Sequence, residues 1–134
     1  MSRLHLVDMR GDTEKQFALM VTVTPEELIP RDHPIRVIKK VADEALKRLE
    51  PQLSAIYSER GRPSIPPEVL LKAQILIALY SVRSERLFCE RLQYDFLFRW
   101  FLDLPGVGTA FDATTFTKNR ERLLEAGQFG EICR

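Results

Sequence analysis

Apolar residues recur at steps of three and four in the stretch that follows Pro34, and this spacing predicts an amphipathic helix. These positions are Ile35, Ile38, Ala42, Ala45 and Leu49. Pro34 suits the first helical position, with Asp32 or His33 able to cap the helix, and Pro51 is expected to set its far limit. Residues 52–57 can add a short helical piece.

The most hydrophobic run of the chain, residues 69–82, follows a loop at residues 58–67 that prolines stiffen. A helix is expected to begin at the end of that loop, at Pro66 or Pro67. Almost every face of this helix is apolar, which is typical of a helix surrounded by other helices. The run carries Lys72 and falls short of the roughly 20 apolar residues that span a bilayer. We therefore expect a central core helix and no membrane span.

Three further helical segments follow, at residues 85–93, 94–104 and 114–126. Ser84 is a good N-cap for the first, and Pro105 with Gly106 ends the second. The third is expected to be capped by Asp112 or Thr114, and a glycine follows it in the position that commonly ends a helix.

Five helices with short connections and no convincing alternating strand predict an all-α fold. We expect about five helices in one compact domain with a helix-turn-helix-like unit, preceded by a poorly structured N-terminal arm. The expected organisation is an arm at residues 1–24, a helical domain at 25–127 and the start of a further segment at 128–134. Residues 19–24 are β-prone and fit a strand or an extended arm.

Composition adds few constraints, because 45% hydrophobic residues and a net charge of +1 are ordinary for a soluble protein. Charge is uneven locally, since residues 60–91 hold six Lys and Arg against three Glu. Cys89 and Cys133 lie in no metal-binding spacing, which favours two free thiols in a reducing compartment. The N-terminus lacks the apolar stretch of a signal peptide, so we expect a cytoplasmic protein.

Residues 66–93 read as a long helix, a four-residue turn and a shorter helix, which is the outline of a helix-turn-helix. In this interpretation the second helix directs side chains to a DNA groove while arginines around it meet phosphates. The candidates are Arg86, Glu90 and Gln93 for the groove, and Arg60, Arg62 and Arg83 for phosphates. A helical hairpin with solvated charges is the commoner alternative.

The last helix offers a second candidate surface. Phe116 and Leu123 are expected to face inward one heptad apart, which leaves other side chains open to phosphates or base edges. These are Thr115, Lys118, Asn119 and Arg122. Glu121 and Glu125 can equally pair with the basic residues on an ordinary solvated face.

No catalytic constellation is visible. The carboxylates, Glu85 and Asp112 among them, do not form by spacing a set able to hold two metal ions, and no nucleotide-binding or hydrolase motif occurs. His33 is explained by helix capping. The aromatic residues between Tyr94 and Phe101 have helical spacing, which favours core packing over stacking on bases.

Three stretches together resemble the N-terminal domain of bacterial insertion-sequence transposases of the InsH type. They are "LIPRDHPIRVI", "YSERGRPSIPPEVLLKAQILIALYSVRSERLFCERLQYDFLFRWFLDL" and "DATTFTKNRERLLEA", in this order. The resemblance covers about residues 23–126 and implies a helix-turn-helix-like module that recognises terminal inverted repeats and assembles the transposase on them. In such transposases a following RNase-H-like domain holds two Mg²⁺ ions with three acidic residues. The chain ends at Arg134, before that domain would begin, so we expect no enzymatic activity of the chain itself and no cofactor in it.

The hypothesis is therefore a DNA-binding N-terminal module whose partner is double-stranded DNA at the terminal inverted repeats. The residues expected to contact DNA are Arg60, Arg62, Arg83, Arg86, Lys118, Arg120 and Arg122. One alternative is an interaction module that forms a homo-oligomer, or docks to and inhibits a full-length transposase. Another is an inactive remnant.

Overall fold

The computed structural model describes residues 23–60, 64–105 and 108–126, with the side chains of 57–60 left out, and this part of the chain is helical without strands. The helices are α2 (Pro25–Leu28), α3 (Ile35–Arg60), α4 (Pro67–Leu79), α5 (Glu85–Arg91), α6 (Phe96–Phe101) and α7 (Ala113–Glu125). The all-α prediction is confirmed. Most of the predicted arm and the segment at 128–134 lie outside the described residues.

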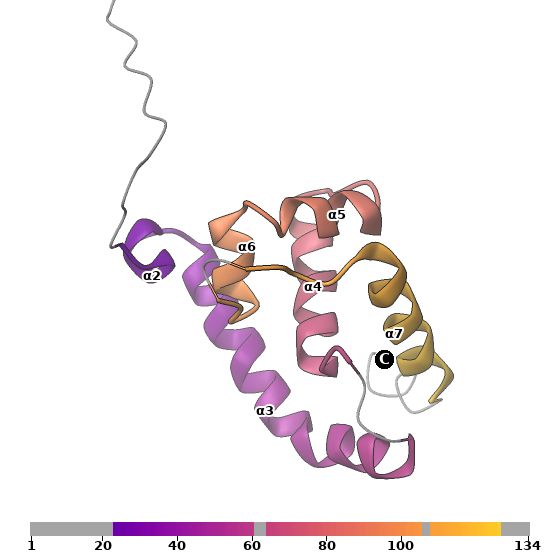
Figure 1. Ribbon diagram of the computed structural model, residues 1–134. Coiled ribbons are helices and arrows are strands. Elements are labelled where there is room, and N and C mark those ends of the chain that lie inside the picture. The colour runs from indigo at the N-terminus through magenta and orange to yellow at the C-terminus, as the bar shows by residue number, and fades with distance from the viewer. Residues whose placement is uncertain (1–22, 61–63, 106–107, 127–134) are drawn as a thin grey trace, which may run out of the picture.

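Helix α4 is the centre of the domain, as its apolar sequence predicts. In Figure 1 it stands between α3 on one side and α7 on the other, and α5 lies across its upper end. Leu70, Ala73 and Leu76 of α4 are each at most 2% exposed. A helix that is apolar all round needs neighbours on every side, and the shorter helices supply them.

The aromatic residues after α5 divide between core and surface. Phe98 and Phe101 are fully buried, whereas Tyr94 is 61% and Phe96 48% exposed. The Asp95 carboxylate accepts a hydrogen bond from the backbone N–H of Phe98 and so caps α6. Tyr94 therefore lies before the helix and Phe96 is its first residue, whereas Phe98 and Phe101 lie within it. The prediction of core packing is therefore correct for the later aromatics and wrong for Tyr94 and Phe96.

The expected limit of α3 at Pro51 is wrong, because the helix continues through this proline to Arg60. Pro51 lacks an N–H and crowds the preceding turn, so it commonly bends a helix. Figure 1 shows the axis of α3 changing direction in its second half. Leu53, two residues beyond the proline, is fully buried. Packing of Leu53 in the core gives a reason for the helix to continue past Pro51.

Helix α2, which the sequence pattern did not predict, is fastened to α3 by Arg36. The Arg36 guanidinium donates hydrogen bonds to the backbone carbonyls of Glu26, Ile29 and Pro30, at 2.6, 2.7 and 3.0 Å. It also pairs with the Glu26 carboxylate, which accepts a further hydrogen bond from the indole N–H of Trp100 in α6. Three helices thus meet at one carboxylate.

Four charged side chains form a closed ring where α3, α4 and the end of α6 meet. Lys72 Nζ lies 2.7 Å from Asp43 Oδ1 and 2.9 Å from Asp103 Oδ2. Lys39 Nζ lies 2.7 Å from Asp43 Oδ2 and 2.9 Å from Asp103 Oδ1. Lys72 is only 4% exposed, and a buried ammonium group is tolerated only when it is paired. The ring therefore explains how the core helix α4 can carry a lysine.

Asp103 occupies a left-handed backbone conformation, with φ of 56°. It follows the C-cap of α6, and the N–H of Leu104 donates to the Arg99 carbonyl at 2.9 Å, which is the hydrogen bond of a Schellman motif. Glycine or asparagine is usual at this position. The aspartate is explained by its carboxylate, which reaches both lysines of the ring.

We predict that Asp103→Asn destabilises the fold by about 1 kcal/mol. Asparagine tolerates the left-handed conformation, so the change removes the charge and keeps the backbone. The figure is reduced from the usual value for a charged hydrogen bond because the Asp103 side chain is largely exposed. Urea unfolding measures the effect, with Glu50→Gln on the exposed side of α3 as the control. Equal midpoints for the two variants would contradict the role given to the ring.

The ring also predicts how stability depends on pH. Burial acts to raise the pKa of Asp103, but hydrogen bonds from Lys39 and Lys72 hold it below its ordinary value of 3.8. The stabilisation is therefore complete above pH 3.8 and is lost as the pH falls through the lower pKa of the folded state. Burial acts to lower the pKa of Lys39, and hydrogen bonds to Asp43 and Asp103 raise it above 10.5. The contribution of this lysine is complete below pH 10.5 and is lost as the pH rises through its folded-state value.

Unfolding free energies measured between pH 2.5 and 5 should therefore fall less steeply with acidification in Asp103→Asn than in the wild type. If the unfolding free energies of the two proteins fell in parallel, Asp103 would contribute nothing to the loss of stability at acidic pH.

Candidate nucleic-acid interface

Helices α5 and α7 are distant in sequence and lie against each other in the fold. The ring of Phe88 in α5 lies 5.8 Å from that of Phe116 in α7, measured between centroids, and both side chains are fully buried. Leu123 is buried as well, so the prediction that Phe116 and Leu123 face inward is confirmed. The outer sides of the two helices are thereby fixed next to each other.

Side-chain caps set the start of both helices. Ser84 Oγ accepts a hydrogen bond from the backbone N–H of Leu87 at 3.1 Å, as expected from the sequence. Of the two caps considered for α7, Asp112 fills the role, and its carboxylate accepts from the N–H of Thr115 at 2.7 Å. This backbone hydrogen bond holds the pKa of Asp112 below its ordinary value. The two caps therefore fix the first residue of each helix and with it the direction of the side chains in the first turn.

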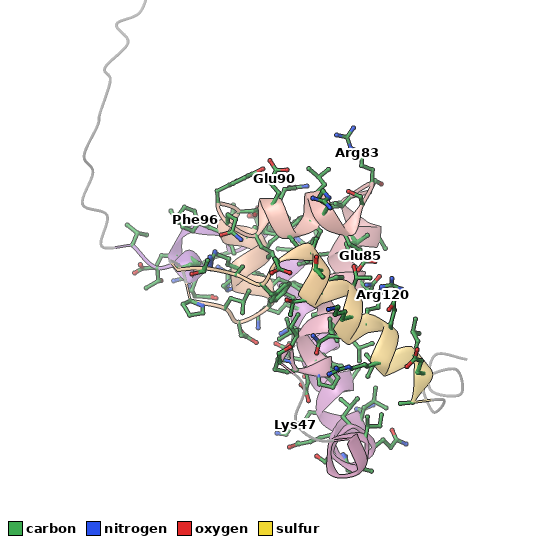
Figure 2. All side chains as sticks on the ribbon, turned by 45° about the vertical axis from the view of Figure 1, so that its right-hand side comes forward. Lys47, Arg83, Glu85, Glu90, Phe96 and Arg120 are labelled. Atoms are coloured by element: carbon green, nitrogen blue, oxygen red, sulfur yellow. The ribbon has the colours of Figure 1, made fainter. Side chains whose placement is uncertain are left out.

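An ion pair joins the two helices beside the aromatic contact. Arg120 Nε lies 2.9 Å from Glu85 Oε1, and Figure 2 shows the two side chains facing each other between α5 and α7. Arg120 is one of the residues predicted to contact DNA. Its contact with Glu85 gives it a part in positioning α5 on α7.

A surface hollow of about 400 Å³ lies between the first half of α5 and the first half of α7. It is lined by Arg86, Ala113, Thr114, Thr117 and Lys118. Arg86 and Lys118, predicted from two separate stretches of sequence, therefore border the same hollow. Neither forms an ion pair with any residue that the structure describes. Lys118 interacts electrostatically with the Asp112 carboxylate without forming an ion pair with it. Cationic and hydroxyl side chains such as these are donors to phosphate oxygens.

The other predicted contact residues lie around this hollow or outside the described side chains. Arg83 is exposed in the turn before α5, and in Figure 2 it points away from the body of the domain. Arg122 is exposed on α7, one helical turn beyond Lys118. The side chain of Arg60 and the whole of Arg62 fall outside the described part.

The prediction that Asn119 is open to phosphates or base edges is wrong. It is only 5% exposed. Its Oδ1 accepts from the backbone N–H of Ile65 at 3.3 Å, and its Nδ2 donates to Ser64 Oγ at 3.0 Å and to the Thr115 carbonyl at 2.8 Å. The asparagine therefore ties α7 to the segment that leads into α4. Its position between Phe116 and Leu123, at steps of three and four, is the signal that could have indicated burial.

The described residues contain no group of three or more His, Cys, Asp and Glu side chains placed to hold a metal ion. His33 caps α3 by accepting the N–H of Ile35 at its Nδ1, as the sequence suggested. Burial, with smaller effects of the Glu85 and Asp112 charges, raises the pKa of the Cys89 thiol to about 11. A thiol that stays protonated at neutral pH is a poor nucleophile. Cys89 is not among the residues that line the hollow.

Comparison with known families identifies the class of protein. The family model described as "Transposase domain (DUF772)" matches residues 23–122, which is more than half of the chain. The chain therefore belongs to this transposase domain family, and its role is related to transposition. No curated protein and no solved structure matches the chain. None of the described helices is both long enough and apolar enough to cross a membrane.

We predict that Asn119→Ala destabilises the domain by about 1–3 kcal/mol, because it leaves buried polar groups at Ser64 and Ile65 without their partner. Gln74→Ala, which truncates an exposed amide on α4, is the control and should change stability little. Denaturant unfolding gives both values. An Asn119→Ala protein as stable as the control would restore the original interpretation of Asn119 as a surface residue.

Proposed function

We propose that this domain binds double-stranded DNA through the adjoining outer sides of α5 and α7, and that its target is the terminal inverted repeat of a transposable element. The observation that carries the proposal is the hollow at which Arg86 and Lys118 meet with Thr114 and Thr117. Membership in a transposase domain family makes DNA the polyanion of interest. The proposal assigns this domain a role in binding and no catalytic step.

Charge around the hollow supports a duplex over a single small anion. Arg83 precedes α5 and Arg122 follows Lys118 on α7, so two further exposed cations are close in sequence to the hollow, alongside the exposed carboxylate of Glu121. Duplex DNA carries one charge per 1.7 Å of axis, and each cation that neutralises a phosphate releases a counterion. A row of cations therefore increases the affinity for a duplex. An isolated phosphate group would need only the cations of the hollow itself.

Binding is tested by fluorescence anisotropy with the full chain. The probe is a labelled duplex that carries the inverted repeat flanking the coding sequence, and a scrambled duplex of equal composition serves for comparison. If four cations each neutralise one phosphate, affinity should fall about 100-fold between 50 and 200 mM salt. The variant Arg86→Ala/Lys118→Ala should bind more weakly and show a salt slope lower by about two.

The control is Lys40→Ala/Lys47→Ala, which removes two exposed charges from α3 without touching α5 or α7. Absence of binding at 50 mM salt would contradict the proposal. So would an equal loss of affinity in the two double variants, since the charge would then act without regard to its place.

A second candidate function is self-association through α3. Val37 and Val41 lie one turn apart on this helix and are 66% and 60% exposed, so together they form a small apolar patch that a second copy could cover. Light scattering of the chain, with and without duplex DNA, distinguishes the two candidate functions. A dimer that is unaffected by DNA and dissociates in the Val37→Lys variant would support self-association.

A further inference from the structure

Exposed polar residues follow one another from the turn before α5 to the turn after it. Arg83, Arg86, Glu90 and Gln93 are all exposed. The opposite side of the helix is fully packed, with Phe88 and Leu92 at 0% exposure. Figure 2 shows Arg83 and Glu90 pointing away from the domain above α5, where no other helix covers them. Arg86 and Glu90 on α5, with Arg83 before the helix and Gln93 after it, therefore form an exposed polar edge.

This edge has the dimensions of a short groove-reading element. The chain keeps a helical path beyond α5, because the N–H of Gln93 donates to the Glu90 carbonyl at 3.1 Å. The rise from Arg86 to Gln93 is then about 10 Å at 1.5 Å per residue, which corresponds to about three base pairs of 3.4 Å. The major groove, about 12 Å wide, admits an α-helix.

The turn between α4 and α5 presents this edge to the outside. Ser81 has φ of 50°, and the N–H of Val82 donates to the Ile77 carbonyl at 3.0 Å, so α4 ends in a Schellman motif. The chain then reverses into α5, which lies across the end of α4 in Figure 1. In a helix-turn-helix the second helix, placed in this way, enters the major groove.

The chemistry of the edge changes along its length. The hollow with Arg86 and Lys118 adjoins the first half of the edge, and the side chains there can donate hydrogen bonds to phosphates. The second half holds the Glu90 carboxylate, which phosphates repel, and the Gln93 amide, and both groups can hydrogen-bond to base edges. Glu90 has no side-chain hydrogen bond or ion pair to any described residue. Gln93 donates only a long hydrogen bond of 3.5 Å, to the Cys89 carbonyl.

We infer that α5 is the base-reading helix of this domain, with Glu90 and Gln93 setting its sequence preference and the Arg86–Lys118 hollow fixing its register on the backbone. The inference rests on the proposed function and specifies it. A glutamine amide is suited to adenine, through the N6 and N7 atoms, and a glutamate accepts a hydrogen bond from the N4 amino group of cytosine.

The test is selection of bound duplexes from a pool with a randomised central segment, carried out with the full chain. Gln93→Ala should lose preference at one position of the selected sequence, and Glu90→Gln at a neighbouring position. Gln52→Ala and Glu50→Gln, exposed on α3, are the matched controls and should select the wild-type sequence. Affinity for the selected duplex should fall about fivefold or more in each α5 variant, with affinity for random duplex unchanged.

The outcomes separate this inference from the proposed function. Recovery of the wild-type sequence by both α5 variants, or enrichment of no sequence by a wild-type protein that binds duplex DNA, would overturn the inference and leave DNA binding intact. No retention of any duplex by the wild type would overturn both.

Discussion

The arrangement of the short helices depends on the contacts of one side chain, Phe88. Its ring lies 5.4 Å from that of Phe98 in α6 and 5.8 Å from that of Phe116 in α7, and all three are fully buried. Helices of seven and six residues, such as α5 and α6, are not stable alone in water, so packing must hold them. Because α5 carries Phe88 on its inner side, its outer side, with Arg86 and Glu90, is exposed.

The charged residues serve two separate purposes. Lys39 and Lys72 are neutralised by Asp43 and Asp103 and join the helices of the core. The cations of the α5–α7 hollow form no ion pair with the described residues, and we propose that they bind DNA phosphates. The net charge of +1 does not distinguish these two groups of cations, because it takes no account of which charges are paired in the fold.

Local sequence signals predicted the helices better than their contacts. Apolar spacing and the caps Ser84 and Asp112 located α5 and α7, because both signals act within a few residues. The continuation of α3 past Pro51 depends on burial of Leu53, which local rules do not contain. The hollow was not predicted, and the cations that line it, Arg86 and Lys118, were predicted as parts of two unconnected sets, since no local pattern states that α5 packs on α7. Burial of Asn119 was accessible from its spacing and was missed.

We propose that duplex DNA docks on α5 and the first half of α7. Amide chemical-shift changes in two-dimensional NMR spectra of the isotope-labelled chain, titrated with the inverted-repeat duplex, locate the docking surface. The largest changes are expected at residues 83–93 and 113–118, with those in α3 small. Changes concentrated on α3 around Val37 and Val41, or spread evenly over the helices, would contradict this proposal.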